Sequence, residues 1–246
     1  MISIEELNQI KEKRNTTLYY EEKEYLQYIF LNAISKYSED FIFKGGTCLR
    51  IIFDLERASE DLDFSTSLGI NEIRKIVNKC LRDFDLLNIK YKVYAEKEFK
   101  GNIRFEIRFE GPLFVGKNAS TNALKIDFNH LKVKNKTARV VQKLFSDVPL
   151  FTTVAMEEKE ILAEKIRALI NRSESRDLYD IWMLLSKKVE VNKELIINKL
   201  KEENSSLDQL KIPSEKEYER DLKYLINNIP FYEQVKKEVL ELINKL

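Results

Sequence analysis

Residues 41–64 read FIFKGGTCLRIIFDLERASEDLDF and predict a strand, a glycine turn, a helix and a second strand in that order. The apolar run 41–43 is typical of a short strand, which Gly45-Gly46 ends. Residues 47–54 have the pattern of a helix that begins at this turn. Because glycine lets the main chain approach an anion and a helix N-terminus attracts negative charge, the turn predicts a phosphate-binding site; an ordinary strand-to-helix turn is the alternative.

The second strand predicts a pair of carboxylates on one face of a sheet. Side chains two residues apart in a strand share a face, so we expect Asp61 and Asp63 to point one way and Leu62 and Phe64 into the core. Neighbouring carboxylates repel each other, and a bound Mg²⁺ or Mn²⁺ ion relieves that repulsion. A solvated strand edge with acidic side chains is the alternative interpretation.

Residues 125–128 repeat this alternation, with Lys125 and Asp127 expected on the outer face and Ile126 and Phe128 in the core. Asp127 is therefore a candidate third carboxylate beside Asp61 and Asp63. Three strand-borne acids that hold two metal ions are typical of enzymes that catalyse in-line displacement at phosphorus. The sequence thus indicates chemistry at a phosphate group.

A lysine lies within the apolar stripe of the helix predicted over 157–171. The stripe consists of Ile161, Leu162, Ile166, Leu169 and Ile170, and Lys165 falls inside it. A lysine on a buried face needs a partner, unless it extends along the margin of the stripe to water. In the next helix, which we expect Ser175 to cap, Asp177 and Asp180 are candidates to orient Lys165 or a nucleotide-binding arginine; an acid at 177 could also serve only the helix dipole.

Lys132, Lys134 and Lys136 share one face if their segment is extended. Such a stripe beside a metal site could bind an RNA backbone or the triphosphate, whereas a solvated edge strand explains it equally well. His130 has no acid or cysteine at catalytic spacing, so we expect a structural or solvent-exposed histidine.

The remaining pattern predicts an α+β fold in two parts. Residues 1–155 are expected to form a small mixed or antiparallel sheet flanked by helices, with further strands at 89–94, 103–109 and 124–128 and helices at 18–37 and 71–87. From Met156 onward the strand pattern stops. Helices are predicted over 157–171, 176–187, 192–202 and 215–245, the last broken at Pro230, so residues 156–246 should form a helical domain.

Composition excludes several classes of protein. The 42 Lys and Arg residues balance 41 Asp and Glu residues, so no overall field draws the protein to nucleic acid or membrane, and any basic site must be local. Cys48 and Cys80 lack metal-ligand spacing and are expected to be reduced core residues. No signal peptide and no uninterrupted apolar run of about 18 residues is present, which predicts a cytoplasmic protein without a membrane segment.

Five blocks, in the same order, resemble the AbiEii/AbiGii nucleotidyltransferase toxins of the DNA polymerase beta-like superfamily. The blocks are FKGGTCLR (43–50), RASEDLDF (57–64), KIDF (125–128), EILAEKIRAL (160–169) and RDLYDIW (176–182). The chain departs from the superfamily pattern in having Gly46-Thr47 where Gly-Ser is usual, and in a long spacer before Asp61. Thr47 keeps a hydroxyl that could donate to phosphate.

The resemblance implies transfer of a nucleoside monophosphate (NMP) from a nucleoside triphosphate (NTP) to RNA, in particular tRNA, by a toxin with a cognate antitoxin. It implies metal binding by Asp61, Asp63 and Asp127 and a catalytic role for these acids and Lys165. The nucleotide-binding residues that it implies are Lys44, Gly45, Gly46, Thr47, Arg57, Ser59, Lys125, Asp177 and Asp180. Two alternatives remain: transfer to a protein hydroxyl, and a member of the fold that binds nucleotide or RNA without chemistry.

Overall fold

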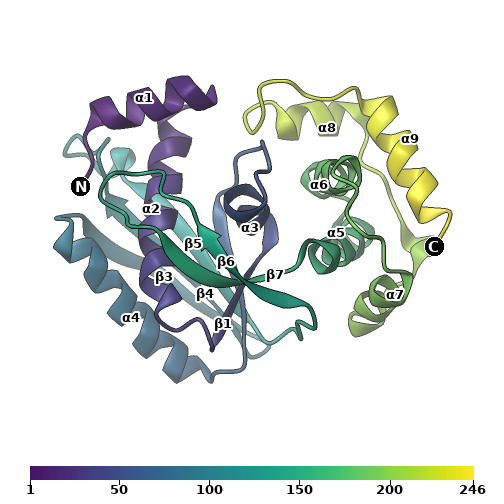
Figure 1. Ribbon diagram of the computed structural model, residues 1–246, viewed down its shortest axis with the longest axis horizontal. Helices are drawn as coiled ribbons and strands as arrows, with labels where there is room; N and C mark the ends of the chain where they lie inside the picture. The colour runs from purple at the N-terminus through teal and green to yellow at the C-terminus, as the bar shows by residue number, and fades with distance from the viewer. The chain divides into compact units, whose positions relative to one another are not determined.

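The computed structural model describes residues 1–246, which divide into two compact units (Figure 1). The first unit comprises Met1–Asp54 and Ala58–Ala155, and the second comprises Leu55–Arg57 and Met156–Leu246. The sequence assigns residues 55–57 to the first part. In the structure they pack with the second unit, because the Arg57 guanidinium is paired there with Asp180.

The first unit is built on a seven-stranded mixed sheet in the order β3-β4-β5-β2-β1-β7-β6 (Figure 1). Strand β1 is antiparallel to β2 and parallel to β7, β2 is parallel to β5, and β3, β4 and β5 are antiparallel neighbours. This is the mixed α+β fold that the sequence predicts. The strands are β1 (Phe41–Lys44), β2 (Asp61–Thr66), β3 (Lys90–Phe99), β4 (Asn102–Glu110), β5 (Asn122–Asn129), β6 (Lys136–Val141) and β7 (Phe151–Met156).

Two of these strands, β6 and β7, are absent from the sequence prediction. Strand β6 lies at the edge of the sheet and exposes Lys136, Ala138 and Val140, so its sequence shows no polar and apolar alternation. Strand β7 has the sequence FTTVAM, which is short and mixes threonine with apolar residues. Both strands extend the sheet beyond β1, so the sheet is larger than expected.

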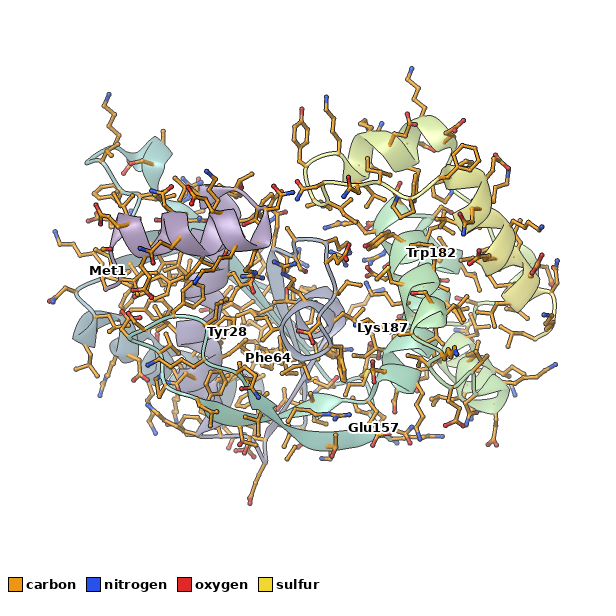
Figure 2. The ribbon with its side chains drawn as sticks, turned by 45° about the horizontal axis from the view of Figure 1, so that its top comes forward. Met1, Tyr28, Phe64, Glu157, Trp182 and Lys187 are labelled. Carbon is orange, nitrogen blue, oxygen red and sulfur yellow. The ribbon has the colours of Figure 1, made fainter.

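Helices α1 (Ile4–Arg14), α2 (Leu18–Ser35), α3 (Gly45–Ile52) and α4 (Ile70–Leu86) and the short 3₁₀ helix η1 (Asn118–Ser120) complete the first unit. The Ser3 side chain caps α1 by accepting from the main-chain N–H of Glu6. Helix α2 packs against β5 and α4, and α4 packs against β3. The core between them is aromatic: the Phe64 ring stacks on Phe128 at 5.3 Å, and Figure 2 shows Phe64 among the side chains of this unit.

Buried charges at the start of α2 anchor the strand that carries Asp127. The Lys23 ammonium donates to the carbonyl of Ala123 in β5 at 2.7 Å. The Glu22 carboxylate accepts from the Asn122 side chain at 2.9 Å and from the main-chain N–H of Leu113 at 2.7 Å. These bonds fix β5 against α2, so the position of β5 in the sheet does not depend on its strand neighbours alone.

The second unit is helical and contains α5 (Glu158–Arg172), α6 (Ser175–Ser186), α7 (Lys193–Glu202), η2 (Leu207–Gln209), α8 (Glu215–Leu222) and α9 (Tyr232–Ile243). The helical stretch predicted over 215–245 is interrupted at Pro230 as expected, but the interruption is wider than predicted, since residues 223–231 separate α8 from α9. Glu174, not Ser175, precedes α6; the Ser175 hydroxyl donates to Asp221 at 2.9 Å instead. None of the helices combines the length and apolar character needed to cross a membrane.

Candidate active site

The pairing of β2 with β5 brings three predicted carboxylates onto one face of the sheet. Asp63 is the register partner of Asp127, and Asp61 is the partner of Lys125. Between them Leu62 is fully buried on the opposite face, where α2 lies. Because paired residues of neighbouring strands share a face, the sheet places the three acids and Lys125 together at the start of β2.

The glycine turn lies directly against this acidic face. Gly45 has φ +78°, in the left-handed region, and a Cβ atom at this position would overlap a carboxylate oxygen of Asp63. Lys44 is the register partner of Asp63 and immediately precedes α3, whose N-terminus has no side-chain cap. The main-chain N–H groups of the first turn, which include Gly45 and Gly46, therefore begin beside Asp63.

The Thr47 hydroxyl, for which the family resemblance implies a phosphate contact, is hydrogen bonded within the protein in this structure. The Thr47 side chain is fully buried, and its hydroxyl donates to the main-chain carbonyl of Asp61 and is hydrogen bonded to the Ser59 hydroxyl at 2.9 Å. A hydroxyl has one proton to donate, so this proton is already used within the protein. In this structure the hydrogen bonds of Thr47 and Ser59 connect the start of α3 to the start of β2.

Arg104 of β4 is a site residue that the sequence interpretation missed. Its Nε–H donates to Asp127 at 2.7 Å, and its side chain is 46% exposed. Burial raises the pKa of the Asp127 carboxyl, and the charge of Asp61 raises it further, whereas Arg104 lowers it; the pKa is raised overall. Alternation in 103–109 indicates the face of Arg104, but only the register of β4 on β5 brings it opposite Asp127.

The donor atoms of this face suit a divalent cation, since carboxylate oxygens are preferred ligands of Mg²⁺ and Mn²⁺. The raised pKa of Asp127 shows that its ionised form lacks full compensation by Arg104 alone. No group of three or more His, Cys, Asp or Glu side chains lies in a geometry that could hold a metal ion. The residue types suit a divalent cation, although the three carboxylates are not arranged as a three-ligand set in this structure.

A second cluster of predicted site residues lies within the helical unit. The Lys165 ammonium in α5 contacts Asp177 at 2.9 Å and Asp180 at 2.7 Å, one turn apart on α6. The Arg57 guanidinium binds both oxygens of Asp180, at 2.5 and 2.6 Å. Arg172, which the sequence interpretation missed, donates to Asp177 at 2.7 Å. These contacts provide the acidic partners that a lysine within an apolar stripe requires.

The charges in this cluster stabilise one another. Burial opposes ionisation of Asp177, but Lys165 and Arg172 outweigh it and lower its pKa to about 2. Burial likewise disfavours the charged form of Lys165, and Asp177 and Asp180 overcome this and raise its pKa. The cluster is therefore a fully ionised network at neutral pH, and both aspartates are fully buried.

The lysine stripe of residues 132–136 lies away from the acids. It follows the C-terminal end of β5, whereas Asp61 opens β2, which runs parallel to β5. Lys132 and Lys136 line a cavity of about 420 Å³ together with the acids Glu39 and Asp40. His130, in the same cavity, bonds through Nδ1 to the Thr66 carbonyl at 2.9 Å. This location does not favour the predicted role of the stripe beside a metal site.

Comparison with known proteins gives one family and several similar structures. Residues 29–238 match the family described as "Nucleotidyl transferase AbiEii toxin, Type IV TA system". No curated protein matches the chain. The nucleotidyltransferase toxin MenT4 from Mycobacterium tuberculosis H37Rv aligns with TM-score 0.72 and 16% identity over 98% of this chain and 90% of its own.

JHP933 from Helicobacter pylori aligns with TM-score 0.60 and 21% identity over 100% of this chain and 94% of its own. At such low identity these two likenesses establish the fold alone. The family match, in contrast, extends over most of the chain and includes every residue of the acidic face and of the ionised network. The chain therefore belongs to the AbiEii family of nucleotidyltransferase toxins.

Proposed function

We propose that this protein transfers an NMP from an NTP to a hydroxyl of RNA, with tRNA as the expected acceptor, and releases pyrophosphate. The observation that carries the proposal is the strand register that places Asp61, Asp63 and Asp127 on one face beside the Gly45 turn. Family membership supports the class of reaction, and the acidic face supports its proposed location.

Asp61, Asp63 and Asp127 are the residues that would hold Mg²⁺ or Mn²⁺. When bound, the metal would lower the pKa of the attacking hydroxyl and offset negative charge on the α-phosphate. Gly45 and Gly46 would bind the triphosphate through main-chain N–H groups at the start of α3. Lys44 and Lys125 are register partners of Asp63 and Asp61, so they share the face to which phosphate would bind.

Lys165 is proposed as a further phosphate contact. An ammonium group has three N–H donors, and Asp177 and Asp180 accept two of them, which leaves one for a phosphate oxygen. Asp177, Asp180 and Arg57 then act as positioning residues that hold Lys165 and keep it charged. Ser59 and Thr47 position the glycine turn through their contact with the start of β2.

The test of this proposal is a transfer assay with each α-labelled NTP separately, total RNA and Mg²⁺. Wild-type protein should label RNA with one preferred NTP, and Asp61→Asn should reduce labelling by about 10³-fold or more, because a metal ligand is lost. Asp85→Asn, which changes an exposed carboxylate at the end of α4, is the matched control and should label RNA like wild type.

The labelled species distinguishes the competing functions. If the label is found in protein and persists after nuclease treatment, the acceptor is a protein hydroxyl and not RNA. If the protein binds NTP but gives no labelled product, it is a nucleotide-binding module and not an enzyme. Loss of labelling in EDTA and its return with Mg²⁺ or Mn²⁺ would support the metal, whereas full activity in EDTA would remove the metal from the proposal.

We also propose that a cognate antitoxin restrains the protein, as the type IV toxin–antitoxin family implies. Induced expression of wild type should arrest growth of the host cell, and expression of Asp61→Asn at the same level should not. Arrest by both proteins would show that toxicity is independent of the acidic face.

A further inference from the structure

The face that carries the three acids continues outward over a β-hairpin. Strands β3 and β4 extend the sheet beyond β5 (Figure 1). Arg104 of β4 is the register partner of Asp127, and Lys97 of β3 is the partner of Arg104. With neighbouring strands about 4.8 Å apart, Asp127, Arg104 and Lys97 form a line about 10 Å long from the acids to the sheet edge.

The acidic residues of β3 point to the other side of the sheet. Arg74 of α4 pairs with Glu96 at 2.5 Å and also with Glu98. The Phe84 ring of α4 packs against Phe109 at 4.5 Å on the same side. The helix-covered face therefore contains the negative charges of this strand and neutralises them.

The open side of the hairpin is correspondingly basic. Lys97 alternates with Glu96 and Glu98, so its ammonium lies on the open side. Lys92 is the register partner of Arg108, which shares a face of β4 with Arg104. Glu106 is the acid between the two arginines, and its own register partner is Lys125. Positive charge thus predominates from β5 to the edge.

Exposed aromatic rings accompany these cations. A register shift between Val93 and Ala95 changes the alternation of β3, and Tyr94 is 60% exposed with the Arg108 guanidinium 4.4 Å from its ring centroid. The buried Arg108 Nε–H has no hydrogen-bond partner. Phe99, at the end of β3, is 46% exposed. Cations interleaved with exposed rings favour unpaired nucleotides, whose phosphates contact the charges and whose bases stack on the rings.

We propose that the open face of the β3–β4 hairpin binds the single-stranded segment of the RNA acceptor that leads to the reacting hydroxyl. This surface, called the hairpin face, consists of Lys92, Tyr94, Lys97, Phe99, Arg104 and Arg108. The inference rests on the proposed function and names the surface by which the acceptor reaches the acids. An open sheet face with exposed rings suits single-stranded RNA, because bases can stack on protein side chains only when they are unpaired.

The test measures RNA binding without catalysis. A fluorescent single-stranded RNA with a 3′-phosphate, which cannot accept NMP at that end, is titrated with protein in the absence of NTP. Lys92→Gln with Lys97→Gln should weaken binding about tenfold and reduce the slope of log affinity against log salt by about 1.4, since each single-strand phosphate contact contributes about 0.7. Tyr94→Ala should weaken binding with little change in this slope, and Tyr94→Phe should bind like wild type.

The matched control is Lys75→Gln with Lys79→Gln, which removes the same charge from exposed positions on α4, on the helix-covered side. This control should bind within about twofold of wild type. The assignment would be overturned if both double variants weakened RNA binding equally, or if the Lys92 and Lys97 double variant did not weaken it. It would also be overturned if the wild-type protein did not bind RNA and transferred the label to protein. Normal face-dependent RNA binding without NMP transfer to an unblocked RNA would instead contradict the proposed function.

Discussion

At the scale of single residues, Gly45 links the main-chain turn to the acidic pair. Gly45→Ala adds a Cβ atom where the Asp63 carboxylate lies and places alanine at a positive φ. We expect a stability cost of about 1–2 kcal/mol from the backbone and a loss of transfer activity of about 100-fold or more, because Asp63 must move. Chemical denaturation and steady-state kinetics measure the two effects.

Gly101→Ala separates these effects. Gly101 also has a positive φ, +82°, but no atom lies within 4 Å of its added Cβ. This control should show a similar loss of stability with near-normal activity. Equal activity in the two variants would mean that the close approach of Gly45 to Asp63 has no role in the reaction.

Asp177 predicts a pH dependence of stability. Its pKa falls from 3.8 to about 2 on folding, so the unfolded chain takes up a proton first as the pH is lowered. The stabilisation by ionised Asp177 is therefore complete above pH 4 and is lost as the pH falls toward 2. Asp177→Asn should unfold more easily at pH 6 and show a smaller decrease in unfolding free energy from pH 4 to 2.5, measured in urea.

The control is Asp208→Asn. Asp208 is exposed in the short helix η2 and its carboxylate has no buried partner, so this variant should keep the wild-type dependence of unfolding free energy on pH. An Asp177→Asn variant with the wild-type slope below pH 4 would contradict the proposed stabilisation by Lys165 and Arg172.

The sequence predicts some of these residue contacts and misses others for a physical reason. Lys165 could be singled out because helical periodicity alone places it in an apolar stripe, where a charge requires partners. Arg104 could not, because its contact with Asp127 depends on which strand pairs with which and in what register. The buried hydroxyl of Thr47 was missed for the same reason, since its acceptor belongs to another element.

At the scale of elements, Thr47 connects α3 to β2 and so sets the glycine turn against Asp61. Thr47→Val keeps the shape and removes the hydroxyl, leaving the Asp61 carbonyl without this donor. We expect a loss of about 1–3 kcal/mol in unfolding free energy, because a buried acceptor is left unsatisfied, and a higher KM for NTP. Denaturation and NTP titration measure both.

Thr121→Val is the matched change, since the Thr121 hydroxyl donates to the carbonyl of Asn118 within its own turn at 2.7 Å. Its KM for NTP should equal that of wild type. A normal KM for Thr47→Val would exclude a positioning role for this hydroxyl.

The elements that the sequence predicts best are those with one face in a core. Strands β2, β4 and β5 and helix α4 alternate or repeat clearly because one side packs in the core and the other is less buried. Strand β6 at the sheet edge has no such contrast, and the separation of α8 from α9 is wider than Pro230 alone requires. Edge position and loop length are tertiary properties that local patterns do not specify.

At the scale of the whole molecule, Arg57 belongs by sequence to the first unit and by contact to the second. It pairs with Asp180, 123 residues away. Arg57→Met should destabilise the helical unit by about 3–5 kcal/mol, because the fully buried Asp180 loses a partner. Hydrogen exchange in α6 should accelerate, while exchange in β2 and β5 stays near the wild-type rate.

Arg50→Met gives the opposite pattern as a control. Arg50 in α3 pairs with Glu24 of α2 at 3.1 Å, entirely within the first unit. Its loss should accelerate exchange in α2 and α3 and leave α6 unchanged. If hydrogen exchange in α6 is unchanged in Arg57→Met, the assignment of residues 55–57 to the helical unit is contradicted. No local sequence pattern indicates that these residues pack with the second unit.

The central claim, that the acidic face transfers a nucleotide, is tested most directly by the fate of two differently labelled phosphates. With the preferred NTP and RNA, α-label should enter RNA and γ-label should appear only in pyrophosphate, in equal amounts, and Asp63→Asn should abolish both products. Transfer of γ-label to the acceptor, or α-label incorporation that survives Asp63→Asn, would contradict the account.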